Sequence, residues 1–321
     1  MLLPMLAGLA PVVSFLGVLL YLDSYKLVTL RSVVALVACG AVEAAAMYAL
    51  HGALLARNPI DFATFTRYVA PLAEELFKGL AIVLLIRANR IGFLVDAAIF
   101  GFAVGPGFAT VENLNYLGEN PIAGMGTWIA RGFGTAIMHG GANAIFAVMG
   151  LAMVERSGRA TLRAFLPGFA IAAVLHSAFN HFFLSPFLST LGIVLVLPPL
   201  LNFVFERSEK AVGAWLGKGF DADAQMLELI NSGRLADSPA GRYLHSLRDR
   251  FKGPVLADLL CYLRLYTELA LRAKGILLMR ENGFEVPVDH ATRDVFTEMR
   301  YLEKSIGRTG VLAIQPMLVS R

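Results

Sequence analysis

Nine polar or charged side chains lie within stretches of this 321-residue chain that are apolar enough to cross a bilayer. They are Glu74, Glu75, Lys78, Glu112, Asn113, His139, Asn143, His176 and Asn180. A charge at the bilayer centre costs on the order of 3 kcal/mol on insertion scales, so such residues are seldom kept without a function. The set therefore predicts a polar site inside the membrane.

A carboxylate beside imidazole and amide groups in a dry cavity suits the attack of water on a carbonyl carbon. The carboxylate takes a proton from the water, and imidazole or amide N–H groups stabilise the oxyanion that forms. Hydrolysis of a peptide bond fits these needs. The sequence has no HExxH motif, no glycine-rich phosphate-binding loop and no evident Ser or Cys nucleophile with a His/Asp partner.

Spacing places an imidazole and an amide on the same face of each of two predicted helices. His139 and Asn143 are four residues apart, and so are His176 and Asn180. Counting about 1.5 Å per residue from the outer ends of the predicted spans, Glu74, His139 and His176 lie roughly 12 to 21 Å below the outer surface. We expect these three side chains to share one layer.

Lys78 and three further intramembrane residues are predicted to be structural. Lys78 follows Glu74 by four residues, a spacing that favours an ion pair between them. Glu43, Asp96 and His181 lie in or near predicted spans without a repeated pattern, which favours hydrogen bonds between helices over chemistry.

Seven apolar stretches are long enough to cross the hydrocarbon core, which takes about 20 residues. They run over residues 2–22, 32–55, 60–86, 93–116, 127–153, 164–184 and 187–205. Hydrophobic residues make up 57% of the chain and charged residues 16%, and the mean hydropathy is +0.63. This composition is typical of integral membrane proteins. We predict an all-α, polytopic helical membrane protein with about seven transmembrane helices.

Charge is concentrated after residue 205. Residues 1–205 hold 11 Lys/Arg and 9 Asp/Glu, whereas residues 206–321 hold 17 and 15. We therefore predict a transmembrane domain over residues 1–205 and a soluble helical cytoplasmic domain over residues 206–321. The second domain contains no motif with evident chemistry, and we expect it to form a homo-oligomer or to bind a cytoplasmic partner.

Start and stop signals support helices in this second region. Ser238 precedes Pro239, a pair typical of a helix start, and Gly233 is expected to end the helix before it. Asp289 is predicted to cap a last long helix that runs through Tyr301.

Basic residues in the predicted loops indicate the orientation in the membrane. One alternate set of loops carries Lys26, Arg31, Arg87, Arg90, Arg156, Arg159 and Arg163. These loops and the tail are predicted to be cytoplasmic, which places the N-terminus outside. Because no basic residue precedes Lys26, residues 2–22 are expected to be a retained span and not a cleaved leader.

The sequence disfavours nucleic-acid binding and a fold constrained by a disulfide bond. The net charge of +4 comes from scattered residues and not from a basic stripe, so no nucleic-acid partner is expected. Cys39 and Cys261 lie in different regions, so no disulfide is expected to constrain the fold.

Four short motifs resemble those of a known family. EELFK at 74–78, FATVEN at 108–113, HGGAN at 139–143 and HSAFN at 176–180 follow one another on successive predicted helices. In this combination they resemble the PrsW family of intramembrane proteases, within the superfamily of CAAX prenyl endopeptidases and bacteriocin-processing membrane proteases. The resemblance covers roughly residues 60–205.

The resemblance implies a multi-pass protease of the bacterial inner membrane that cleaves a single-pass membrane protein, such as an anti-sigma factor, within the lipid bilayer. Glu74 and Glu75 match the catalytic glutamates, and we expect Glu74 to be the base that activates water. His139 and His176 match the essential histidines, and Asn180 would assist His176.

The resemblance leaves the presence of zinc open. In one version Glu112, His139 and His176 bind zinc and Glu74 is the base. In the other, Glu74 and a histidine activate water without a metal, and His176 with Asn180 forms an oxyanion hole. Glu112 stands where the CAAX endopeptidases carry His, and by the depth count it lies nearer the outer face.

Two functions of other classes compete with proteolysis. Intramembrane Glu and His residues also serve ion or proton-coupled transporters, which are often built from repeated halves that this sequence lacks. The second competing function is that of a non-proteolytic membrane scaffold that senses membrane state through its tail.

Overall fold

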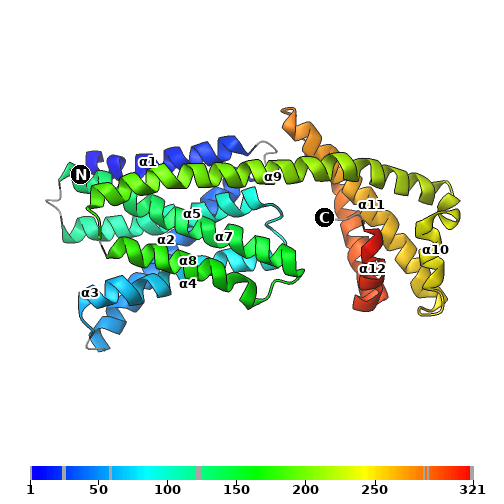
Figure 1. Ribbon diagram of the computed structural model, residues 1–321, viewed down its shortest axis with the longest axis horizontal. Coiled ribbons are helices and arrows are strands. Elements are labelled where there is room, and N and C mark those ends of the chain that lie inside the picture. The colour runs from blue at the N-terminus through cyan, green and yellow to red at the C-terminus, as the bar shows by residue number, and fades with distance from the viewer. Residues whose placement is uncertain are drawn as a thin grey trace. The chain divides into compact units, whose positions relative to one another are not determined.

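A computed structural model of the chain describes residues 2–23, 27–57, 60–120, 124–181, 183–284, 286–287 and 289–318 (Figure 1). This described part is helical and contains no strand, which confirms the all-α prediction. It divides into two compact units, Met1–Ser208 and Glu209–Arg321. Lys26, used above for the orientation, lies outside the described residues.

The first unit is a bundle of helices joined by short connections. Its elements are α1 (Leu2–Leu22), α2 (Leu30–Arg57), α3 (Phe62–Thr64), η1 (Phe65–Val69), α4 (Ala70–Arg87), α5 (Leu94–Glu119), α6 (Met125–Ala130), η2 (Arg131–Ala136), α7 (Ile137–Ser157), α8 (Leu162–Asn180) and the first part of α9 (Pro186–Asn231). The elements η1 and η2 are π-helical turns.

Five helices in the described residues are long and apolar enough to cross a membrane: Leu30–Arg57, Leu94–Tyr116, Gly134–Ser157, Leu162–Asn180 and Phe187–Asn231. The chain is therefore a multi-pass membrane protein. The two remaining predicted spans fall outside this set. Among the described residues the first predicted span, 2–22, contributes a shorter apolar helix, Val13–Leu22. The third predicted span, 60–86, is divided by η1 and carries charged residues of the polar cluster.

Helix α5 forms the centre of the first unit, and all of its residues from Val95 to Ala109 are buried. Two glycines allow neighbouring backbones to touch it, a common device in membrane helix packing. A Cβ on Gly105 would lie 2.2 Å from the backbone nitrogen of Gly140 in α7, and one on Gly107 would lie 1.8 Å from the carbonyl oxygen of Val37 in α2. The first contact brings α5 and α7 together, and the second joins α5 to α2.

Helix α9 does not end near residue 205, where the predicted span ends. It continues to Asn231, so one helix contributes to both compact units. Apolar residues fill its first part, which includes Pro198 and Pro199, and a mixed amphipathic sequence fills its second. Neither proline ends the helix. The signal that ends it is Gly233, as predicted, which adopts a left-handed φ of 75°.

The second unit contains the end of α9, η3 (Arg234–Asp237), α10 (Pro239–Ser246), α11 (Gly253–Glu281), α12 (His290–Ile314) and η4 (Gln315–Met317). Both predicted caps are confirmed: the Ser238 side chain accepts a hydrogen bond from the Gly241 N–H, and Asp289 accepts one from the Thr292 N–H. The last helix extends past Tyr301 to Ile314, with a kink at Gly307.

Candidate active site

Glu75 and Lys78 form an ion pair inside the first unit. Glu75 is 2% exposed and Lys78 0%, and the Lys78 Nζ donates to Oε1 of Glu75. The predicted pair of Lys78 with Glu74 is therefore wrong. Residues three and four positions before Lys78 both lie on its helix face. Glu75, three positions before it, is the carboxylate that points inward.

Glu75 also holds His176. The Nδ1 of His176 lies 2.7 Å from Oε1 of Glu75. Because an ionised carboxylate only accepts hydrogen bonds, this nitrogen carries the ring proton. The other nitrogen, Nε2, is left with its lone pair and lies 3.8 Å from Oε2 of Glu74.

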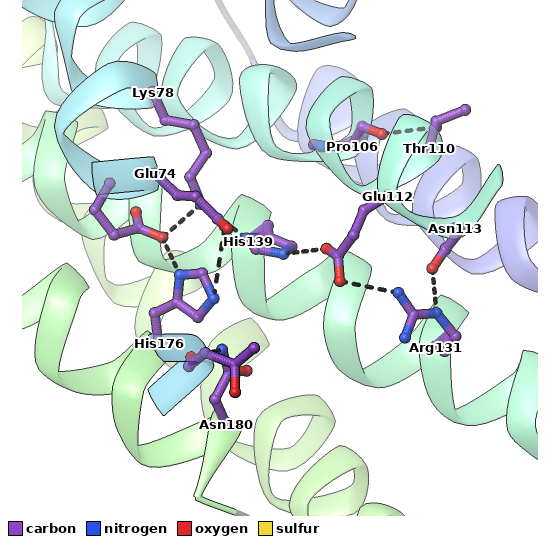
Figure 2. A network of polar contacts seen from close by, with 12 residues as sticks. Glu74, Lys78, Pro106, Thr110, Glu112, Asn113, Arg131, His139, His176 and Asn180 are labelled. Carbon is purple, nitrogen blue, oxygen red and sulfur yellow. Dashed lines mark hydrogen bonds and ion pairs between the residues drawn. The ribbon is translucent and has the colours of Figure 1, made fainter. Parts of the chain in front are cut away.

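A second carboxylate holds the other histidine. The Nε2 of His139 lies 2.8 Å from Oε2 of Glu112, so Nε2 donates and Nδ1 accepts from the Lys78 ammonium, also at 2.8 Å. Arg131 in η2 fixes Glu112 through a 2.9 Å bond to Oε1, and its Nε donates to Asn113. Figure 2 shows this chain of contacts.

Glu112 is thus not a separate residue near the outer face. The depth count started at Tyr116, but α5 extends to Glu119, and the π-helical turn η2 precedes the helix of His139. Both features change the height at which these residues meet, so Glu112 lies in the same layer as His139.

Glu74 is the carboxylate of the cluster that lacks a direct partner. In the described part of the chain its oxygens have ion-pair contacts at 3.8 Å and no hydrogen bond. Its side chain is 14% exposed, whereas those of His139 and His176 are 1% and 3% exposed. The rings of the two histidines meet edge to face, with centroids 4.7 Å apart. Glu74 is therefore more accessible than the two fixed imidazoles beside it.

Glu74, His139 and His176 each offer a ligand atom, and these atoms lie within 4.8 Å of one another. Two imidazoles and a carboxylate are ligands that zinc prefers, and a carboxylate behind the far nitrogen of a ligand histidine is the usual support. Glu75 and Glu112 are placed for that support. The donor set fits a metal, although His139 must first release either Lys78 or Glu112.

Asn180, predicted to assist His176, uses its amide elsewhere. Its Nδ2 donates to the Thr66 carbonyl, and Ser177 donates to the carbonyl of Arg67. Thr66 and Arg67 lie five and four residues before Pro71. Because proline has no N–H, Pro71 cannot donate a hydrogen bond to either of their carbonyls. Two side chains of α8 thus satisfy the π-helical turn η1 and join α8 to the start of the helix that carries Glu74.

Asn143, the amide paired with His139 in the sequence, also makes a contact between helices. Its Nδ2 donates to the Gly101 carbonyl of α5 at 2.9 Å. Asp96 accepts the N–H groups of Gly92 and Phe93 at the start of α5, and His181 bonds the Ser177 carbonyl. These contacts fit structural roles.

His51 belongs to the cluster and carried no motif in the sequence. From α2, its Nδ1 lies 3.8 Å from Oε1 of Glu74. The available signal was an ionisable residue within the second predicted span, in MYALHGALL.

Comparison with known proteins gives one finding. A family model described as PrsW family intramembrane metalloprotease matches residues 28–204, which include all residues of the cluster. No curated protein and no solved structure matches the chain. The matched region is more than half of the chain, and the chain belongs to the PrsW family of intramembrane metalloproteases.

Proposed function

We propose that this protein is an endopeptidase that hydrolyses a peptide bond of a single-pass membrane protein, with Glu74 as the base. The observation that carries the proposal is the 3.8 Å separation between Oε2 of Glu74 and Nε2 of His176. This gap is too long for a hydrogen bond and short enough for one water beside it to bond both atoms.

The residues would act in a defined order. Oε2 of Glu74 accepts a proton from the water while the water oxygen bonds to the carbonyl carbon of the substrate. When the C–N bond breaks, Glu74 returns that proton to the leaving amine. Glu75 keeps the proton of His176 on Nδ1 throughout, so that Nε2 stays directed at the reacting water. Glu112 and Lys78 hold His139 beside it.

The same residues support a bound zinc ion. His139, His176 and one carboxylate oxygen of Glu74 would hold it, while the other oxygen of Glu74 would still accept the proton. The ion would supply positive charge that polarises the substrate carbonyl and the water. Glu112, which the sequence placed among the ligands, would support His139 from behind. Asn180 remains a candidate for the oxyanion hole only if its amide leaves Thr66.

The proposed setting is the bacterial inner membrane. In this proposal seven spans cross the membrane, with α1 and the segment of η1 and α4 completing the set. The N-terminus then lies outside and residues 206–321 lie in the cytoplasm. The scattered basic residues of alternate loops support this orientation. The substrate type suggested by the family resemblance is an anti-sigma factor, and the second unit would bind a cytoplasmic partner or another copy of the chain.

The proposal is tested by comparative proteomics of membrane-protein fragments released from cells that make the parent protein or the Glu74→Gln variant at equal levels. We expect at least one fragment from a single-pass protein to depend on Glu74. Identical fragment patterns would contradict the proposed activity, and proton-coupled flux that survives Glu74→Gln in liposomes would favour a transporter.

A further inference from the structure

His51 and His176 face opposite oxygens of the Glu74 carboxylate. Nδ1 of His51 is 3.8 Å from Oε1, and Nε2 of His176 is 3.8 Å from Oε2. The side chains of His51 and Glu74 are 16% and 14% exposed, more than those of His139 and His176 at 1% and 3%. The proposed base therefore lies between two imidazoles that come from different helices.

Packing fixes the ring of His51. It meets the ring of Phe65 edge to face, with centroids 5.0 Å apart and an interplanar angle of 84°. Phe65 is 3% exposed and is the first residue of η1, the turn that leads into the helix of Glu74. The element that sets the position of Glu74 thus also sets the orientation of this imidazole.

Hydrogen bonding indicates which nitrogen of His51 carries the proton. Nε2 is buried and has no hydrogen-bond partner among the described residues. An orphaned buried N–H is rarer and more costly than an unused lone pair, so the proton belongs on Nδ1. Nδ1 is the nitrogen that lies next to Oε1 of Glu74. The distance exceeds a direct hydrogen bond and suits a bridge through one water.

We propose that His51 is a positioning residue for the reaction: its Nδ1–H, through one bound water, orients the Glu74 carboxylate so that the other oxygen faces His176. The inference rests on the proposed role of Glu74 as the base. His51 lies outside the four motifs that carry the family resemblance.

The test measures cleavage of a membrane protein whose processing in cells depends on Glu74, using purified full-length enzyme in proteoliposomes. His51→Ala lowers kcat by about 10- to 100-fold and changes KM by less than about twofold, as expected for a group that orients a reactive side chain. His51→Gln keeps a donor and recovers part of kcat. Met47→Ala is the matched control, because it removes a side chain that is 1% exposed one turn earlier in α2.

A second measurement separates positioning from packing. Added imidazole raises kcat of His51→Ala towards the parent value and leaves Met47→Ala unchanged. Parent-like kcat in His51→Ala overturns the inference, and so does a loss that neither Gln nor imidazole relieves. If the parent protein itself does not cleave, the proposed function fails before His51 is tested.

Discussion

Oε1 of Glu75 lies 2.7 Å from Nδ1 of His176 and also accepts a hydrogen bond from Lys78. One oxygen of Glu75 therefore serves two buried partners, while its other oxygen, Oε2, is buried and has no hydrogen-bond partner among the described residues. Its neighbour Glu74 has no direct hydrogen bond in the described structure. Two adjacent glutamates thus have different roles, which follow from the turn of about 100° between consecutive helical residues.

Glu74→Gln and Glu75→Gln are both expected to abolish cleavage, for different reasons. Glu74→Gln removes the proton acceptor and leaves the folded protein as stable as the parent. Glu75→Gln leaves the Lys78 ammonium buried without its counter-charge, which costs about 3 kcal/mol or more. Cleavage assays and thermal unfolding in detergent measure the two effects separately.

The double variant Glu75→Gln/Lys78→Met is the control for this difference. Removing both charges restores much of the thermal stability but not the activity, because His176 still lacks its carboxylate. Equal stability of the two single glutamine variants would contradict the assigned ion pair.

Glu112 is expected to act on the rate through His139. Glu112→Ala frees the His139 ring and lowers the cleavage rate by about 10- to 100-fold, the usual cost of losing such a partner. Arg131→Ala has a smaller effect, because Glu112 keeps its bond to His139. Cleavage by Glu112→Ala at the parent rate would remove Glu112 from the site.

Much of the site was predictable from the sequence because helical spacing and depth constrain it. The layer of Glu74, His139 and His176 follows from residue counting along straight helices. Counting fails at π-helical turns and at uncertain helix ends, which is why it separates Glu112 from His139 although their side chains are in contact. Periodicity also leaves open which of two carboxylates Lys78 meets, since that depends on the helix facing it.

The approach of His51 to Glu74 and the use of Asn180 could not be predicted, because both depend on contacts between distant segments. His51 stands alone in its span, without a repeated partner. Asn180 shares the spacing of Asn143, and both amides turn out to bond backbone carbonyls of neighbouring helices. The carbonyl that Asn180 meets is exposed by Pro71, a link that only the fold reveals.

Asn180→Ala separates a structural from a catalytic role. If Asn180 joins α8 to η1, the variant loses about 1–2 kcal/mol of stability, because the Thr66 carbonyl loses its donor, and its cleavage rate falls only slightly. Loss of an oxyanion donor would instead lower kcat by about 100-fold or more with unchanged stability. Thermal unfolding and kcat, measured on the same preparation, distinguish the two roles.

Zinc dependence gives the last prediction. A chelator such as 1,10-phenanthroline is expected to abolish cleavage, and added zinc to restore it, because Glu74, His139 and His176 offer ligand atoms within 4.8 Å of one another. Metal analysis of the purified protein should show zinc bound to the parent and lost from His176→Ala, whereas Asn143→Ala, whose amide bonds Gly101, keeps it. To bind the ion, His139 must release Lys78 from Nδ1 or Glu112 from Nε2. If Nδ1 is the ligand atom, the Lys78→Met variant is expected to bind zinc more tightly than the parent in competition with the chelator. Full activity of a metal-free preparation would contradict the zinc site and leave the pair of Glu74 and His176 to activate water alone.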